Sequence, residues 1–384
     1  MTIPDSILER HADKAEPLCA RPVFILGIAE RSGTNYLQDL LRLHPDCDVD
    51  GLELEEDHFV AYSDLLMRYV NLASKQWKAW WGQEQLQKER NQLCQCIGDG
   101  LVSYLHLQVR NRRVLTGKAP ADKPLKVLVT KTPDVTNVNL FFEFFPNAYL
   151  LILVRDGRAV VESAVRTFYR NFADEARKWA TRASAIRRFA AGESSIGRKY
   201  LIVRYEDLYT NTSDELRRIM SFLDMDPALY DFEAAINLPV RGSSSLRQEG
   251  ADWRQSFIAP GIHWNPVPKA SDFKPLERWR NWNHAEHQRF NWIAGKYLPL
   301  FGYEMEPNRD KRWLWATRNM MLDVLPIEKT AHLWQKARRE MEFSSNKLDT
   351  ARRLLSKLWS TIKPAQAAKF DSLHHESRTS THLL

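Results

Sequence analysis

The stretch FILGIAERSGTNYLQDLLRLHP, Phe24 to Pro45, is the part of the sequence that best predicts the fold class. The apolar run from Val23 to Ile28 predicts a buried parallel strand, and apolar residues with helical spacing follow the polar loop that ends in Gly33. A strand, a tight loop and a helix form an anion site, because the first backbone N–H groups of the helix are unpaired and its dipole adds partial positive charge. We therefore expect a phosphate or sulfate group to bind at this loop.

The loop departs from the P-loop of nucleotide triphosphatases at one important position. With Gly27 as the first glycine of the pattern G-x-x-x-x-G-K-[ST], Gly33 stands where the lysine belongs and Thr34 stands at the Ser/Thr position. That lysine contacts the β- and γ-phosphates of a nucleotide, so its absence argues against an ATP or GTP hydrolase. An ordinary strand-to-helix turn is the alternative for this loop taken alone.

Three further apolar runs predict strands, each followed by a polar turn and a helix. The strands are expected at Lys126–Thr130, Tyr149–Val154 and Tyr200–Val203, and helices are expected at Val135–Phe145 and Ser213–Leu223. Strands that alternate with helices imply parallel crossovers, helices on both faces of the sheet, and ligands at the carboxyl ends of the strands. The predicted fold class is therefore α/β, with a P-loop-type parallel sheet, a helical insertion and a C-terminal helical extension.

The segments around the predicted sheet divide the chain into three parts. We expect one domain at residues 21–305, with a helical insertion over the sheet at about 60–113. A basic helical extension is expected at 306–363, and a polar, disordered tail at 364–384. In the extension, large apolar residues recur every seven residues, a spacing that suits a helix packed on a partner helix or on the domain. These residues are Trp334, Met341, Leu348, Leu355 and Ile362.

The composition predicts an ordinary soluble protein. The chain has 384 residues, of which 44% are hydrophobic and 27% are charged. Its most apolar run, Tyr149 to Val154, is far shorter than the roughly 20 residues that a membrane-spanning helix needs. The first twenty residues lack the apolar segment of a secretory signal. We therefore expect a cytoplasmic location.

The positive charge of the chain is concentrated in the extension. Residues 309–363 contain thirteen Lys/Arg and six Asp/Glu, an excess of seven that equals the net charge of the whole chain. This distribution argues against a nucleic-acid partner and favours contact of 309–363 with a membrane surface or another helix. No metal site is expected, because the four cysteines are scattered and have no histidines at zinc-site spacing. They are Cys19, Cys47, Cys94 and Cys96.

Three motifs in this order resemble a known enzyme family. The segments are ERSGTNYLQDLLRLHPD, LLILVRDGRAVVESAV and VRYEDL, within residues 21–305. They resemble the sulfotransferases that use 3′-phosphoadenosine 5′-phosphosulfate (PAPS), especially bacterial members and the protein-tyrosine sulfotransferases, whose first motif also contains R-S-G-T. The resemblance implies transfer of a sulfuryl group from PAPS to a hydroxyl or amine of an acceptor, without a metal ion. The acceptor class is left open among sugars, lipids, peptides and small metabolites.

The resemblance implies two anion sites for PAPS, the first of which binds the 5′-phosphosulfate. It is assigned to the loop residues Arg31, Ser32, Gly33 and Thr34, followed by Asn35. In this sequence Asn35 replaces a threonine that is common in the family. Glu30 is a second departure, because it adds negative charge beside the site.

The second anion site binds the 3′-phosphate, and the resemblance assigns it to Arg155 and Ser163. The two residues are eight positions apart, at a strand end and in the following helix. Arginine can contact a phosphate through two hydrogen bonds. The alternative is a surface ion pair between Arg155 and Asp156 with a serine on a helix face. The resemblance adds Tyr205 near the nucleotide and Ser243 and Ser244, in the segment RGSS, to a loop that closes over it.

Sulfuryl transfer requires a base for the acceptor proton and cations for the charge on the leaving oxygen. The resemblance implies Glu53 as the base, because a catalytic glutamate follows the HPD segment in the family. Three neighbours compete with it, and a solvated acidic turn is the alternative for the whole segment. The resemblance also implies that Lys131, with Arg31, stabilises the leaving group, whereas a structural role would pair Lys131 with Asp134 or Asp156. The competing candidates for the base are Glu55, Glu56 and His58.

Two other functions remain open from the sequence. One is a P-loop kinase or another nucleotide-phosphate transferase, against which the missing lysine counts. The other is a non-catalytic nucleotide-binding protein that interacts with a partner or an anionic lipid through its basic extension.

Overall fold

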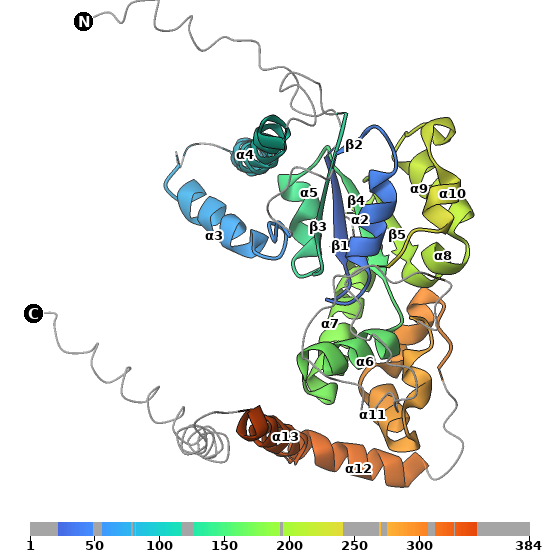
Figure 1. Ribbon diagram of the computed structural model, residues 1–384. Coiled ribbons are helices and arrows are strands. Elements are labelled where there is room, and N and C mark those ends of the chain that lie inside the picture. Colours follow the sequence, from blue (N-terminus) through green and yellow to red (C-terminus); the bar gives the residue numbers. More distant parts are fainter. Residues whose placement is uncertain are drawn as a thin grey trace, which may run out of the picture. The chain divides into compact units, whose positions relative to one another are not determined.

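The computed structural model of the chain describes most of the predicted domain and two helices after it (Figure 1). The chain divides into two compact units, Met1–Glu306 and Pro307–Leu384. The described residues are 22–48, 56–77, 80, 82–116, 126–192, 195–240, 269, 275–305, 312–325 and 327–343.

A parallel sheet of five strands forms the centre of the first unit, in the order β2-β3-β1-β4-β5. Every residue of β3 and β4 is buried, as expected for parallel strands covered on both faces. All four predicted strands are present within two residues of their expected ends. The fifth, β2, is only two residues long, too short for an apolar pattern to predict. The strands are β1 (Pro22–Gly27), β2 (Cys47–Asp48), β3 (Val127–Thr132), β4 (Tyr149–Val154) and β5 (Tyr200–Arg204).

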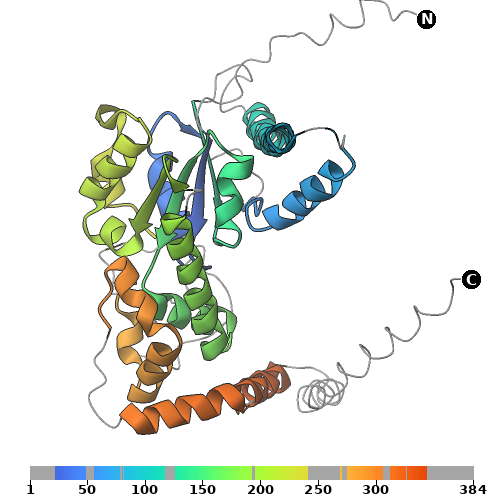
Figure 2. The same cartoon turned by 180° about the vertical axis from the view of Figure 1, so that it is seen from behind.

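Helices cover both faces of this sheet, which confirms the predicted α/β class (Figures 1 and 2). Alternate residues of β1 enter two hydrophobic clusters: Phe24 and Leu26 enter one, and Val23 and Ile25 enter the other. The first cluster is completed by α4 (Gln83–Thr116), α5 (Phe141–Phe144), α6 (Gly157–Phe168), α7 (Phe172–Ala191) and α11 (His284–Ala294). The second is completed by α2 (Thr34–Arg42), α8 (Tyr205–Thr210), α9 (Thr212–Phe222) and α10 (Phe232–Ile236).

The predicted insertion after β2 is helical, as expected. It consists of α3 (Ser63–Ser74) and the long α4, which lies against α5. Gly98 allows this close approach, because a Cβ at that position would lie 1.8 Å from the carbonyl oxygen of Phe144. A side chain here would therefore push α4 away from the sheet.

The continuous helix predicted at Val135–Phe145 is wrong. The segment forms a short 3₁₀ helix, η2 (Val138–Leu140), and then α5. Asn137 has a left-handed backbone with φ of 63°, and its side-chain amide donates 2.9 Å hydrogen bonds to the Ala61 carbonyl and to Asp64. The contact with the insertion therefore fixes a conformation that interrupts the helix.

Short helices end the first unit and two longer ones form the described part of the second. After η4 (Pro227–Leu229), the described part of the first unit contains α10, η5 (Arg278–Asn281), α11 and η6 (Gly295–Phe301). The second contains α12 (Arg312–Val324) and α13 (Ile327–Phe343). Among the helices described, none combines the length and the apolar character needed to cross a bilayer.

Candidate functional site

The carboxyl ends of four parallel strands place the predicted site residues along one edge of the sheet. The loop before α2 follows β1, Lys131 lies near the end of β3, Arg155 follows β4 and Tyr205 follows β5. In parallel sheets, ligands bind at this edge. The residues that the sequence singled out by strand ends are therefore brought together by the topology alone.

The loop after β1 is held in a tight conformation by backbone bonds and by two left-handed residues. The Ile28 amide donates to the Leu153 carbonyl at 2.8 Å, which ties the loop to β4. Arg31 has φ of 71°, and Gly33, the residue before α2, has φ of 100°. A Cβ on Gly33 would lie 2.4 Å from the ring of Tyr205. Glycine is therefore required here both for its backbone conformation and for the space it leaves.

Arg31 connects the two anion sites that the sequence predicted. Its Nε donates a hydrogen bond of 3.1 Å to Ser163 Oγ, and its carbonyl accepts a 2.7 Å bond from Arg155 Nη1. Its guanidinium carbon lies 5.9 Å from the centre of the Phe168 ring. The residues assigned to the 5′-phosphosulfate and to the 3′-phosphate thus form one continuous polar cluster.

Arg155 is buried and is held in place from three sides. Besides the bond to the loop, its Nη2 donates to the Pro275 carbonyl at 2.6 Å, and its guanidinium carbon lies 4.4 Å from the centre of the Tyr205 ring. Asp156 does not form the surface pair with Arg155 that was the alternative reading. It pairs with Arg158 at 2.7 Å and accepts the Arg158 amide at the start of α6.

Arg278, in η5, is a third guanidinium of this cluster and was missed by the sequence analysis. Burial, together with the nearby charges of Arg155 and Arg31, lowers the pKa of Arg278 to about 9. Burial and Arg155 lower the pKa of Arg31 to about 10. Because each cation makes the others less favourable, the cluster is suited to an anion that would offset their repulsion. Among the described residues, no strand leads directly into η5, so the strand-end pattern carries no signal for Arg278.

Two buried polar atoms of the cluster lack hydrogen-bond partners among the described residues. They are Ser32 Oγ and Arg155 Nε. Buried polar groups are normally paired, and both of these can donate a hydrogen bond. These two donors, the three arginine cations of the cluster and the N-terminus of α2 together fit the phosphate and sulfate groups of PAPS. Thr34 is buried in the first turn of α2, and Asn35 beside it is partly exposed.

The acidic segment after β2 lies against the end of β3. The Asp57 amide donates to the Lys131 carbonyl at 3.3 Å, and the His58 amide donates to Thr132 Oγ1 at 2.9 Å. Lys131 is buried and its Nζ lies 3.7 Å from Glu56 Oε1, while Glu56 Oε2 lies 3.3 Å from His58 Nε2. A structural role for Lys131 was expected to pair it with Asp134 or Asp156. The structure pairs it with Glu56.

Asp57, between Glu56 and His58 in the sequence, is held by hydrogen bonds within the protein. Its carboxylate accepts from Thr130 Oγ1 at 2.7 Å and from the Phe59 amide at 2.8 Å. Burial raises its pKa. The other predicted residues of this region and of the late loop, Glu53, Glu55, Ser243 and Ser244, lie outside the described residues.

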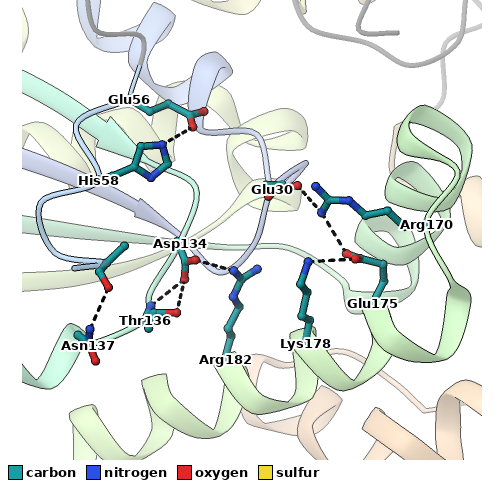
Figure 3. A network of polar contacts seen from close by, with 11 residues as sticks. Glu30, Glu56, His58, Asp134, Thr136, Asn137, Arg170, Glu175, Lys178 and Arg182 are labelled. Atoms are coloured by element: carbon teal, nitrogen blue, oxygen red, sulfur yellow. Dashed lines mark hydrogen bonds and ion pairs between the residues drawn. The ribbon is translucent and has the colours of Figure 1, made fainter. Parts of the chain in front are cut away.

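The unexpected Glu30 is explained by an ion pair with a distant residue (Figure 3). Its carboxylate contacts the guanidinium of Arg170, which follows α6 and also lies 3.5 Å from Glu175. Lys178 pairs with Glu175 at 3.1 Å, and in the same view Arg182 pairs with Asp134. The negative charge beside the loop is therefore balanced by the corner between α6 and α7.

A partly buried carboxylate, that of Glu206, also fixes the start of α6. Glu206 accepts the Asp156 amide at 3.0 Å through Oε1 and the Tyr303 hydroxyl at 2.6 Å through Oε2. Burial raises the pKa of Glu206. Because Asp156 follows Arg155 directly, these two bonds position the turn that carries Arg155. In the described parts of the chain, no three His, Cys, Asp or Glu side chains converge as a metal site.

Comparisons with known proteins agree with the motifs. The model of the family described as "Sulfotransferase family" matches residues 22–228, more than half of the chain. Protein-tyrosine sulfotransferase A of Caenorhabditis elegans is 29% identical over 213 residues, which cover 53% of this chain and 50% of that protein. Protein-tyrosine sulfotransferase of Drosophila melanogaster is 26% identical over 232 residues, which cover 57% of this chain and 41% of that protein.

The chain thus spans about half the length, or less, of the curated relatives it matches. Among solved structures, the sulfotransferase domain from the Synechococcus PCC 7002 olefin synthase matches with a TM-score of 0.40 and 21% identity. That match covers 74% of this chain and 96% of the other.

Proposed function

Because the chain belongs to the sulfotransferase family, we propose that it transfers the sulfuryl group of PAPS to a hydroxyl or amine of an acceptor. The observation that supports this activity best is the cluster of Arg31, Arg155 and Arg278 beside the loop after β1. The charges of Arg155 and Arg31 disfavour the protonated form of Arg278, so the cluster favours a ligand with more than one anionic group, and PAPS carries a phosphosulfate and a second phosphate.

The donor is proposed to bind across this cluster. The start of α2, with the backbone N–H of Gly33, and the side chains of Ser32, Thr34 and Asn35 bind the 5′-phosphosulfate. Arg155, Ser163 and Arg278 bind the 3′-phosphate, and Arg31 lies between the two groups because it contacts both Arg155 and Ser163. Tyr205 supports Gly33 and Arg155, and Ser243 and Ser244 of the late loop complete the nucleotide site.

The transfer is proposed to be in line, with a carboxylate of residues 53–56 as the base. PAPS, when bound, supplies the sulfuryl group. The carboxylate takes the proton of the acceptor hydroxyl or amine as its oxygen or nitrogen bonds to sulfur, and the bond from sulfur to the bridging phosphate oxygen breaks. Lys131 and Arg31 stabilise the negative charge on that oxygen. Glu56 is supported by its position 3.7 Å from Lys131, and Glu53 by the sequence resemblance.

Nucleotide binding tests the donor proposal. 3′-Phosphoadenosine 5′-phosphate (PAP) should raise the melting temperature more than adenosine 5′-phosphate at equal concentration, because only PAP carries the 3′-phosphate. At 100 times its Kd, PAP should add about 2.7 kcal/mol to the free energy of unfolding. Equal shifts for the two nucleotides, or Mg²⁺-dependent turnover of ATP, would replace the proposal with a kinase or another nucleotide-phosphate transferase.

Paired substitutions test the base. Glu53→Gln and Glu56→Gln should both keep PAP binding, and the variant that removes the base should lose turnover by about two to four orders of magnitude. Turnover is measured with labelled PAPS and a panel of acceptors, which also tests the acceptor class. Full turnover in both variants would exclude Glu53 and Glu56 and move the base to Glu55 or His58.

A further inference from the structure

Large apolar side chains are exposed along α12. Trp313, Met320 and Val324 are separated by seven and four residues, which places them on one face of the helix. Their exposed fractions are 69%, 57% and 76%. Leu314 and Met321, each one position later, extend this surface by about 100° around the helix and are also exposed. α12 therefore presents a broad apolar surface to solvent.

The apolar surface continues onto α13. Ile327 and Trp334 lie two turns apart on one face, with exposed fractions of 51% and 59%. Lys329, between them in sequence, is exposed, and three more basic residues follow in the same helix. Two amphipathic helices with exposed tryptophans and lysines or arginines have the composition of helices that lie in a membrane interface. The three further basic residues are Lys336, Arg338 and Arg339.

The net charge of residues 309–363 distinguishes between a second copy of the chain and a lipid bilayer as the partner of these apolar faces. Residues 309–363 carry the whole positive excess of the chain, thirteen Lys/Arg against six Asp/Glu. α12 and α13 themselves hold six Lys/Arg and four Asp/Glu, and the flanking residues of 309–363 hold the rest of the excess. A second copy of the chain would bring the same excess, so self-pairing would bring like charges together. An anionic bilayer attracts this excess and accepts the tryptophans at its headgroup level.

From the exposed apolar faces and the charge together, we propose that α12 and α13 bind anionic phospholipid surfaces and hold the protein at a membrane interface. Attraction to the headgroups brings the helices to the bilayer, and burial of Trp313 and Trp334 stabilises the bound state. The proposal does not depend on the sulfuryl-transfer activity, since its readout is lipid binding.

Vesicle binding of the full-length protein tests the proposal. We expect binding to vesicles of phosphatidylcholine with 30% phosphatidylglycerol, and at least tenfold weaker binding to phosphatidylcholine alone or in 0.5 M salt. Arg318→Gln combined with Lys329→Gln should weaken binding to the anionic vesicles about 25-fold, as each basic residue near the surface contributes about fivefold. Trp313→Ala combined with Trp334→Ala should weaken it at least tenfold.

Matched controls use exposed residues of the first unit. Trp80→Ala with Trp292→Ala removes two exposed tryptophans, and Arg68→Gln with Lys88→Gln removes two exposed charges. Neither control should change vesicle binding. Absence of binding, or equal losses in variants and controls, would overturn the proposal. A dimer in light scattering that the double tryptophan variant dissociates, without any lipid binding, would instead assign the surface to a second copy.

Discussion

Replacing Arg278 with methionine should have opposite effects on stability and on nucleotide binding. The pKa of Arg278 is lowered from 12.5 to about 9, chiefly by burial and then by Arg155 and Arg31. One pKa unit corresponds to about 1.4 kcal/mol, so the charge destabilises the ligand-free protein by at most about 5 kcal/mol. Methionine keeps much of the volume, and apolar replacement of such charges often stabilises a protein by 1–4 kcal/mol.

We expect Arg278→Met to raise the ligand-free free energy of unfolding by about 1–2 kcal/mol, because the lost contacts of the guanidinium offset part of the gain. For a unit of this size, Met1–Glu306, that is a rise of roughly 2–3 °C in melting temperature. The Kd for PAP should increase about 10- to 100-fold, which corresponds to one charge-assisted hydrogen bond of about 1.5–3 kcal/mol.

The assay combines thermal unfolding with calorimetric titration of PAP, and Arg280→Met is the matched control. Arg280 lies in the same η5, but its side chain is 66% exposed and pairs with Glu277 at 2.8 Å. Exposed pairs contribute little, so this variant should stay within about 0.5 kcal/mol of the wild type and bind PAP normally. A lower melting temperature for Arg278→Met with unchanged PAP binding would refute the reasoning, because Arg278 would then be a structural cation.

Three further predictions concern other residues of the first unit. Gly33→Ala should lower the free energy of unfolding by about 3 kcal/mol, because a left-handed alanine costs about 1–2 kcal/mol and its Cβ also meets a buried ring; Gly100→Ala, where a Cβ meets nothing within 4 Å, should be neutral or stabilising in the same urea titration. Ser163→Ala removes the acceptor of the 3.1 Å bond from Arg31 and should weaken PAP binding about fivefold while leaving adenosine 5′-phosphate binding unchanged; equal weakening of both would place Ser163 away from the 3′-phosphate. Burial lowers the pKa of His106 from 6.5, because the folded protein disfavours the protonated imidazole. The contribution of His106 to the free energy of unfolding is therefore fully present above pH 6.5 and is lost as the pH falls through the folded-state pKa. The slope of this loss is at most about 1.4 kcal/mol per pH unit. The decline in unfolding free energy between pH 7.5 and 5.5 should therefore be smaller in His106→Leu, and an identical decline would contradict this assignment.

The sheet could be predicted from the sequence because its strands are apolar on both faces. β1, β3, β4 and β5 appear as short apolar runs, each closed by a polar turn, and parallel pairing then follows from the helices between them. The segment after β3 could not be predicted in the same way. Its apolar spacing is helical, but the bonds of Asn137 to the insertion decide its backbone. Such contacts form only in the folded chain and leave no local pattern.

The residues of the candidate site could also be predicted only in part. The strand-end rule located Arg31, Lys131, Arg155 and Tyr205, since position in a parallel sheet is enough to bring them together. It missed Arg278, which reaches the cluster from a 3₁₀ turn far along the chain. It also left Glu30 unexplained, because the balancing charge of Arg170 lies beyond α6 and becomes a neighbour only through packing.

The bond from the Tyr303 hydroxyl to Glu206 has a consequence for where the domain can be cut. The family match ends at residue 228, yet the Pro275 carbonyl holds Arg155, and Tyr303 shares the carboxylate that fixes the next residue. A fragment that stops at the end of the family match would keep the loop and the strand ends but lose these supports and Arg278. The smallest autonomous piece that retains the anion cluster must therefore extend through Tyr303, well beyond the boundary that similarity alone would choose.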